Sequence, residues 1–392
     1  MTPPARLRIV SALGVIQIFT WGSSYYLMAI LAKPIAVETG LSTGIISGGV
    51  TLGFLVEGLA ALAIGHLIHA RGGRTVLAAG IALLAAGLAL LSIAQGLMSY
   101  FLAWGIIGLG MSASLYDAAF STLGRIFGDG ARPAITQLTL WGGFASTVCW
   151  PLTAEMTELV GWRGACATYA ALHALVFLPL ALWAIPREGR SSYLDRSDIA
   201  QGAPNVGITD IRFLCILVAG LVLSALSTIW SIQLVTMLTG FGYSTAAAIA
   251  IGTLIGPCQV GARFIEMLTR GRYHPVWTMS VATSTVFLGF AGLLAGIPAA
   301  AAMIAYGAGN GLWSIARGAL PLALFGPRDY PRIMGRLATP VLVTSAAAPA
   351  LGAWSNVTFG PQATLWGLTI AALLPLAAAI VLARFVKVSA EE

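Results

Sequence analysis

A short basic stretch that ends one long apolar run and begins the next decides the fold: residues 65–74 read GHLIHARGGR. The run that ends here, 43–69, and the run that follows, 75–95, are each predominantly apolar. Each is long enough to cross the hydrocarbon core of a bilayer as a helix, which needs about 20 residues. So short a connection predicts two antiparallel membrane-spanning helices joined by a tight basic loop.

The rest of the chain has a similar composition. Of its 392 residues, 58% are hydrophobic and only 9% are charged, whereas soluble domains carry about 25% charged residues. So few charges cannot cover a water-facing surface, which excludes a soluble, disordered or fibrous protein. The net charge of +7 does not indicate nucleic-acid binding, because the basic residues lie in short loops and not in a patch interleaved with aromatic residues.

Cutting the sequence at charges, prolines and glycines gives twelve candidate membrane-spanning helices. They are roughly 9–32, 43–69, 75–95, 98–123, 134–156, 163–186, 211–238, 243–268, 276–296, 298–325, 337–356 and 363–386. The runs lack the alternating pattern of a transmembrane strand and are about twice its length. The sequence therefore predicts an all-α membrane protein with twelve transmembrane helices.

Lysine and arginine residues predict the orientation. With the N-terminus in the cytoplasm, all but three of the 21 lie in cytoplasmic segments or at cytoplasmic span ends; the exceptions are Lys33, Arg163 and Arg317. Cytoplasmic loops of membrane proteins are enriched in these residues. We expect a multi-pass protein of the cell membrane, a bacterial inner membrane, with both termini in the cytoplasm.

An internal repeat divides the chain. The longest polar stretch, 187–210, predicts a cytoplasmic linker between an N-terminal bundle, 1–186, and a C-terminal bundle, 211–392. Two pseudo-symmetric six-helix bundles are typical of transporters that bind substrate at the repeat interface. Short motifs recur after 198 or 199 residues: Gly108-Leu109-Gly110 with Gly307-Ala308-Gly309, Gly128-Asp129 with Gly326-Pro327, and Ser146 and Pro151 with Ser345 and Pro349.

The stretch 65–74 resembles the loop between spans two and three of the major facilitator superfamily, which has the pattern Gly-x-Leu-x-Asp-Arg-x-Gly-Arg-Arg. Here His69 occupies the acidic position, and the matching positions are Gly65, Leu67, Gly72 and Arg74. The resemblance implies a secondary transporter that works by alternating access, with spans one, four, seven and ten lining the cavity. In that family the acid stabilises the outward-open state, so this chain departs from the family there.

Within the superfamily, the chain is similar to the monocarboxylate-porter-like branch. The similarity rests on residues 256–263, GPCQVGAR, and residues 317–321, RGALP. The branch also carries a lysine in span one and an aspartate in span eight. This chain has no lysine inside span one, and Gln259 stands at the aspartate position.

Four charged residues lie away from the ends of the predicted spans and are the candidates for function: Glu57, Asp117, Arg263 and Arg317. A charge at the bilayer centre costs about 2.5–3.5 kcal/mol on insertion scales and usually marks function. By the repeat offset, Asp117 in the first half corresponds to position 316 in the second half, next to Arg317. The acid of one half and the base of the other could therefore form a gate between the halves. Alternatively, Arg317 binds an anionic substrate while Asp117 titrates, or the two are structural. Glu57 and Asp117 are the candidates for proton coupling; a neutral, hydrogen-bonded Glu57 is the structural alternative.

Polar and aromatic residues away from the span ends are candidates for the substrate path. Gln259 and Arg263, one turn apart on one helix face, could hold a carboxylate together, unless Arg263 extends to the cytoplasmic interface. Aromatic residues that anchor a protein at the membrane surface gather at span ends. Aromatic residues nearer the middle of a span are therefore candidates for lining a substrate cavity, with simple packing as the alternative for each. The predicted substrate-binding residues are Tyr26, Tyr116, Gln259, Arg263, Asn310, Trp313 and Arg317.

The sequence predicts no catalytic residue, metal or cofactor. It has no Cys-x-x-Cys pair and no Walker A motif, and His173, the only histidine well inside a span, has apolar sequence neighbours. The expected function is secondary active transport of a small organic solute, an organic anion being one option, with or without proton coupling. Efflux of amphipathic or drug-like compounds and an intramembrane enzyme or sensor are the alternatives. The expected partners are this solute, protons and the lipid bilayer, with no nucleic acid, and the expected state is a monomer.

Overall fold

The computed structural model describes residues 3–187, 207, 209–269 and 272–391. Within these residues every regular element is helical, which confirms the all-α class. Most of the predicted linker, 187–210, lies outside the described residues.

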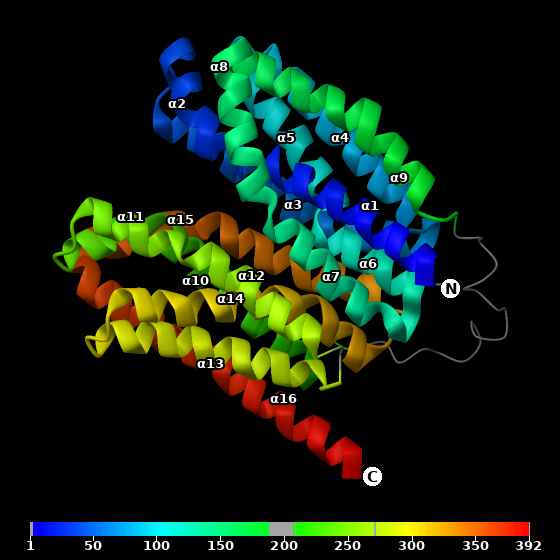
Figure 1. Ribbon diagram of the computed structural model, residues 1–392, viewed down its shortest axis with the longest axis vertical. Helices are drawn as coiled ribbons and strands as arrows, with labels where there is room; N and C mark the ends of the chain where they lie inside the picture. Colours follow the sequence, from blue (N-terminus) through cyan, green and yellow to red (C-terminus); the bar gives the residue numbers. More distant parts are fainter. Residues whose placement is uncertain (1–2, 188–206, 208, 270–271, 392) are drawn as a thin grey trace. The chain divides into compact units, whose positions relative to one another are not determined.

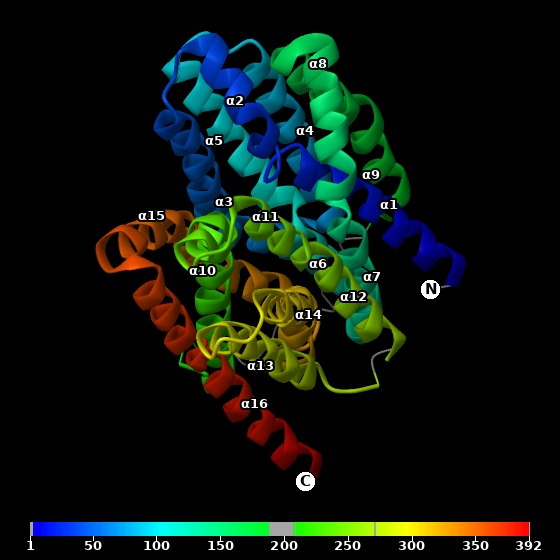
Figure 2. The same ribbon diagram turned by 60° about the vertical axis from the view of Figure 1, so that its left-hand side comes forward.

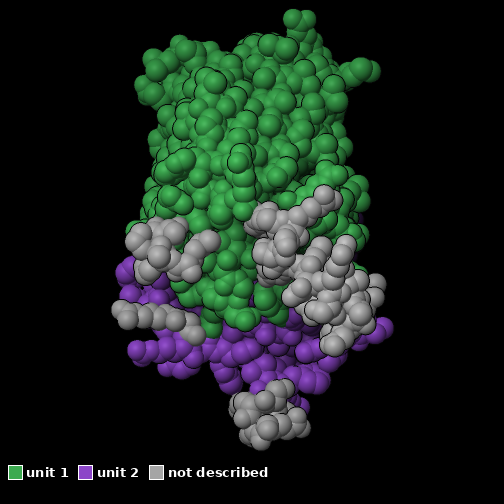
Figure 3. All heavy atoms as spheres, turned by 90° about the vertical axis from the view of Figure 1, so that its right-hand side faces the viewer, with its two compact units in different colours: residues 1–204, 326–343 green, residues 205–325, 344–392 purple. Residues whose placement is uncertain are grey.

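The chain divides into two compact units, coloured separately in Figure 3. Unit 1 comprises Met1–Pro204 and Gly326–Val343, and unit 2 comprises Asn205–Phe325 and Thr344–Glu392. Gly326–Val343, which the sequence assigns to the C-terminal bundle, groups with unit 1. The division into six-helix bundles at 187–210 stays a prediction.

Unit 1 is built from the helices of the first predicted half (Figure 1). They are α1 (Pro3–Gly22), α2 (Met28–Thr39), α3 (Thr43–Arg71), α4 (Gly73–Ser92), α5 (Leu97–Ser114), α6 (Tyr116–Phe127), the 3-10 turn η1 (Gly128–Ala131), α7 (Arg132–Gly143), α8 (Ala145–Leu172), the π-helical turn η2 (His173–Phe177) and α9 (Leu178–Ala184). The first turns of α15 (Tyr330–Ala371) complete the unit.

Unit 2 follows the same pattern with longer helices. It contains α10 (Ile211–Gly240), α11 (Thr245–Thr253), α12 (Ile255–Leu268), α13 (Pro275–Leu294), α14 (Ala299–Phe325), the remainder of α15 and α16 (Leu373–Glu391). Among the described residues, seven stretches are long and apolar enough to cross a membrane. Two of these, Leu97–Ala184 and Tyr330–Val386, each contain several successive helices.

The repeat is also visible in the backbone. Gly161 and Gly360 have φ angles of 71° and 80° and kink α8 and α15 between successive predicted spans. Gly128 and Gly326, with φ angles of 57° and 74°, form a second pair of turns. Each pair is separated by the sequence offset found for the motifs. Only glycine adopts these angles readily, so the repeated glycines reflect repeated turns.

Five predicted spans are interrupted, which the hydropathy did not indicate. Span one, predicted as 9–32, breaks between Gly22 and Met28. Spans four, five, eight and twelve break at Leu115, Phe144, Leu254 and Ala372. Every interruption leaves polar backbone groups that must be satisfied inside the protein, because lipid offers no partner. Such breaks commonly line transport sites.

The core of unit 1 lies among α2, α4, α5 and α8. Trp104 and Tyr169 are fully buried there. A Cβ at Gly53 on α3 would meet the Trp104 ring, and one at Gly108 on α5 would meet the Gly53 backbone. Gly49 and Gly53 thus permit a close approach of α3 to α5, and the adjacent packing of α4 against α5 is visible in Figures 1 and 2.

In unit 2, α13 and α14 lie along each other (Figures 1 and 2). Trp230 of α10 is fully buried, with ring centroids 5.2 Å from Phe290 and 6.3 Å from Tyr306. Its indole N–H points to the Met303 sulfur at 3.1 Å. Trp230 is therefore part of the core of unit 2.

Candidate functional site

The break in span one is formed by Ser23–Leu27 and is tied to neighbouring helices. Gly22, the last residue of α1, lies so close to α8 that a Cβ there would overlap the Cys149 side chain. After it, the Tyr26 amide donates to the Trp21 carbonyl at 3.0 Å, a wider turn than an α-helix makes. The close approach and the wide turn direct the two tyrosines that follow out of the helix line.

Aromatic rings from four helices and the break meet at this point. We call them the aromatic cluster: Trp21, Tyr25, Tyr26, Phe54, Tyr116, Phe120 and Trp150. Centroid distances run from 5.0 Å for Tyr116–Phe120 to 6.3 Å for Trp21–Tyr26. Tyr25 and Trp150 remain 40% and 42% exposed. The cluster thus offers open ring faces beside the predicted residue Tyr26, whereas the predicted Tyr116 is buried.

A buried glutamine connects the breaks in spans one and four. The Gln17 side-chain amide donates to the Ser114 carbonyl at 2.7 Å, and its oxygen accepts from the Trp21 indole at 3.1 Å. Ser114 is the last residue of α5, directly before the break at Leu115. Gln17 therefore satisfies backbone at one break and orients an aromatic ring at the other. The sequence analysis did not select it, although a glutamine inside a predicted span is a visible signal.

The two predicted proton carriers lie in different environments. Glu57 is 6% exposed, on the same face of α3 as Phe54 of the aromatic cluster, one turn away. Asp117 is half-buried in the first turn of α6, directly after the break at Leu115. Glu57 thus stands in the middle of a long helix, whereas Asp117 stands at the start of one.

In unit 2, α12 and α14 bring predicted residues together at Gly311. A Cβ at Gly311 would overlap the Gln259 backbone, so glycine permits the close crossing. One turn further along α12, Arg263 is 7% exposed, and its Nε donates to the Gly311 carbonyl at 3.3 Å. Arg263 of α12 is therefore tied to the backbone of α14.

The remaining predicted residues of unit 2 follow one stripe of α14. Asn310, Trp313 and Arg317 are three and four residues apart, a spacing that places them on one helix face. The Asn310 amide donates to the Ser227 hydroxyl of α10 at 3.2 Å. Trp313 is 7% exposed and Arg317 is half-buried. The structure thus gathers these residues, Gln259 and Arg263 within unit 2.

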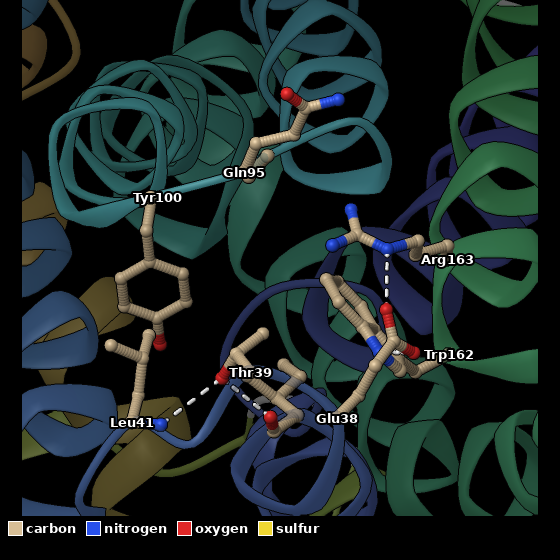
Figure 4. Close-up of a pocket in the computed structure, with 10 residues that line it drawn as sticks. Glu38, Thr39, Leu41, Gln95, Tyr100, Trp162 and Arg163 are labelled. Atoms are coloured by element: carbon tan, nitrogen blue, oxygen red, sulfur yellow. Dashed lines mark hydrogen bonds and ion pairs between the residues drawn. The ribbon is translucent and has the colours of Figure 1, made fainter.

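A separate pocket of about 330 Å³ lies at the end of α2 (Figure 4). There Arg163 Nε donates to Glu38 at 2.8 Å, the Trp162 indole donates to the same carboxylate at 2.6 Å, and an Arg163 amino group reaches the Ser92 carbonyl at 3.0 Å. The hydrogen bond from Arg163 holds the pKa of Glu38 below its usual value, against partial desolvation. None of the predicted site residues lines this pocket. We call the Glu38–Trp162–Arg163 contacts the outer clasp.

The basic loop at residues 65–74 packs against α6. Arg125 of α6 donates to the His69 carbonyl at 2.6 Å, and Gly73 lies where a Cβ would overlap Thr122. Gly65 and Gly335 allow α3 and the first turns of α15 to cross closely within unit 1. The acidic residue that the family pattern has at position 69 is thus replaced by a histidine whose backbone carbonyl receives the arginine.

Two helical units with interrupted spans, internal repeats and charged residues at membrane depth define the class as a secondary transporter. Residues 13–316 match the family model of the Major Facilitator Superfamily. The match covers more than half of the chain, and the chain belongs to this superfamily. It is therefore a multi-pass membrane protein that transports small solutes, in a family of transporters and not of enzymes.

Solved structures show the same fold. The proton:xylose symporter XylE is 14% identical, with a TM-score of 0.75 over 98% of this chain and 97% of that one. The human organic anion transporter MFSD10 (TETRAN) is also 14% identical, with a TM-score of 0.74 over 96% and 100% of the two chains. The E. coli fucose:proton symporter FucP is 13% identical, with a TM-score of 0.70 over 95% and 98%. No curated protein matches the chain.

Proposed function

We propose that the solute is a small organic anion with a flat apolar part. The observation that carries the proposal is the aromatic cluster, whose Tyr25 and Trp150 present open ring faces beside an interrupted span. A planar group can stack on such faces, and each aromatic pair contributes about 0.5–1.5 kcal/mol beyond area burial. Tyr26 lies between these two rings and completes the surface.

The cationic residues of unit 2 support the anionic part of the proposal. Arg263 is buried beside α14, and Arg317 is half-buried on that helix, so both positive charges lie at membrane depth. A charge-assisted hydrogen bond contributes about 1.5–3 kcal/mol, which is enough to select a carboxylate. The solved neighbours include an organic anion transporter as well as sugar symporters. We therefore keep the monocarboxylate-porter-like branch as a proposal.

We also propose that transport is coupled to protons through Glu57 or Asp117, with Glu57 the first candidate. Glu57 is 6% exposed in the middle of α3, and Asp117 is half-buried directly after the break at Leu115. Both carboxyls stand inside predicted membrane spans, where an ionisable side chain usually marks function. A carrier must hold its proton in one state and release it in another, and a desolvated carboxyl does so when water enters.

The topology that accompanies this proposal has both termini in the cytoplasm of a monomer in a bacterial inner membrane. It also has two bundles, 1–186 and 211–392, joined by a cytoplasmic linker. The asymmetric distribution of lysine and arginine supports the orientation. Protease accessibility of tags at the two ends in sealed inverted vesicles tests it, since tags on a cytoplasmic end are cleaved only in that orientation.

Uptake of radiolabelled benzoate into proteoliposomes, with benzamide as the neutral competitor, tests the solute class. We expect benzoate uptake and at least tenfold weaker competition by benzamide. Trp150→Leu should raise the KM for benzoate about two- to tenfold. Trp366→Leu is the matched control, because Trp366 is similarly exposed at 53% and lies on α15 of unit 2. Absence of benzoate uptake, or equal competition by benzamide, would contradict an organic anion as the solute.

A further inference from the structure

The buried histidine at the end of α8 faces the break in span one. His173 and Ser23 are both fully buried, and His173 Nε2 lies 2.7 Å from the Ser23 hydroxyl oxygen, although the residues are 150 positions apart. Ser23 is the first residue after α1, where the helix ends. The contact therefore joins predicted span six to the point at which span one breaks, and α9 beyond it runs beside α1 (Figures 1 and 2).

The hydrogen atoms at this contact follow from counting donors. The Ser23 hydroxyl donates its single proton to the Phe19 carbonyl at 2.7 Å. The hydroxyl oxygen must then accept from His173, so Nε2 carries the ring proton. Nδ1 has no hydrogen-bond partner among the described residues. In this tautomer Nδ1 carries no proton, so no buried N–H group is left without an acceptor. His173 is therefore a neutral hydrogen-bond donor to the break.

A π-helical turn sets the direction of the imidazole. His173–Phe177 form this turn, and the Leu178 amide donates to the His173 carbonyl, five residues back. Single π turns are rare and are found frequently at functional sites. Phe177 stacks on Phe19 with centroids 4.6 Å apart and planes 29° apart. Two contacts one turn apart, Phe177–Phe19 and His173–Ser23, thus hold the last turn of α1.

Two members of the aromatic cluster follow directly after this anchor. Tyr25 and Tyr26 lie two and three residues beyond Ser23, in the irregular turn that ends at Leu27. The ring of Tyr25 contacts Phe54, and that of Tyr26 contacts Trp150, so the cluster depends on where this turn lies. We propose that His173 is a positioning residue, which through Ser23 sets the place of the span-one break and so holds Tyr25 and Tyr26 in the substrate-facing cluster. The second part of this inference rests on the proposed function.

Hydrogen–deuterium exchange of the purified protein tests the anchor without any solute. His173→Gln keeps an amide N–H near the position of Nε2. The side chain of His173→Asn is about one bond shorter, so its amide N–H does not reach the Ser23 hydroxyl. A buried neutral hydrogen bond contributes about 1 kcal/mol. His173→Asn should therefore speed exchange of the amides of residues 24–29 about fivefold, while His173→Gln restores wild-type exchange. Residues 275–294 of α13, which belongs to unit 2, are the internal control.

Ser23→Ala should speed this exchange at least as much as His173→Asn, because it removes the bond to His173 together with the bond to the Phe19 carbonyl. Adding His173→Asn to Ser23→Ala should have no further effect, since the bond between the two residues is already lost. Equal exchange in His173→Gln and His173→Asn, or acceleration spread over 275–294, would overturn the anchor. If His173→Asn does not fold, Phe177→Leu provides the comparison: it loosens the same turn but keeps the hydrogen bond, so it should leave exchange at 24–29 nearer wild type than Ser23→Ala does.

Benzoate uptake tests the positioning of the aromatic cluster. His173→Asn should raise the KM about fivefold with little change in maximal rate per folded transporter, and His173→Gln should restore it. In a Tyr26→Leu background, His173→Asn should have no further effect. An additive effect would overturn positioning through Tyr26. If wild-type uptake does not depend on Tyr26 while exchange responds as described, the proposed function fails and the anchor stands.

Discussion

Two glycines on the same helix should respond in opposite directions to the same substitution. Gly105 and Gly108 both lie on α5, one turn apart. A Cβ at position 105 would meet no atom within 4 Å, whereas a Cβ at position 108 would lie 3.0 Å from the Gly53 Cα and carbonyl carbon and closer still to its oxygen. The neighbour at 108 is backbone and cannot rotate away.

The magnitudes follow from this geometry. Gly105→Ala should stabilise the protein by about 0.5–1 kcal/mol, because alanine is the better helix former. Gly108→Ala should destabilise it by about 1–3 kcal/mol, the usual cost of forcing an extra carbon into a packed contact. The two variants therefore differ by up to about 4 kcal/mol, although they add the same methyl group one turn apart.

Thermal unfolding of the purified protein in one detergent, at one protein concentration, measures the difference. Wild type should melt between the two variants, with Gly108→Ala lowest. Gly53→Ala should also lower the melting temperature, because a Cβ there would meet the Trp104 ring at 2.9 Å. If Gly105→Ala and Gly108→Ala shift melting in the same direction by similar amounts, the close crossing of α3 and α5 is wrong.

Further predictions concern charged residues. The pKa of Glu38 lies below its usual 4.5, so the outer clasp stabilises the fold above about pH 4.5 and loses this contribution as the pH falls through the lowered pKa. The melting temperature of wild type should therefore fall on acidification, and Glu38→Gln should remove the part of this fall that the clasp causes. An unchanged pH profile of melting in Glu38→Gln would refute this role of the clasp. Arg317→Ala should abolish benzoate uptake at near-normal folded yield, which size-exclusion chromatography checks; retained uptake would exclude Arg317 from solute binding. Glu57→Gln should abolish accumulation driven by a pH gradient but spare counterflow exchange, whereas Asp117→Asn should retain more gradient-driven accumulation; full accumulation in both variants would contradict proton coupling through these residues.

Composition and local pattern were sufficient for the class of the protein. A chain with 9% charged residues must hide most of its surface in lipid, whatever its exact packing. The positions of the mid-span charges, such as Glu57 and Arg317, could also be assigned, because a charged residue inside an apolar run can be recognised from the sequence alone. The repeat offset predicted from motifs reappeared in the turns at Gly161 and Gly360.

The faces of the helices could not be assigned from the same pattern. In a membrane protein the lipid-facing and core-facing sides of a helix are both apolar, so hydropathy does not separate Trp230, which is buried in a core, from Trp150, which is 42% exposed. The break in span one was also hidden, because Ser23 and its neighbours continue an apolar run whose backbone is satisfied from elsewhere.

The sequence by itself thus determined a membrane transporter with repeated helices and a short set of charged and aromatic candidates, because these follow from composition and local order. Only the tertiary structure decided that His173 donates to Ser23, that Gln17 bridges two interrupted spans, and that Arg263 meets the Gly311 carbonyl. The three contacts that join different spans, His173–Ser23, Gln17–Ser114 and Arg263–Gly311, link residues 48 to 150 positions apart. No local pattern specifies such partners; they depend on which helices pack together and where glycines permit close approach.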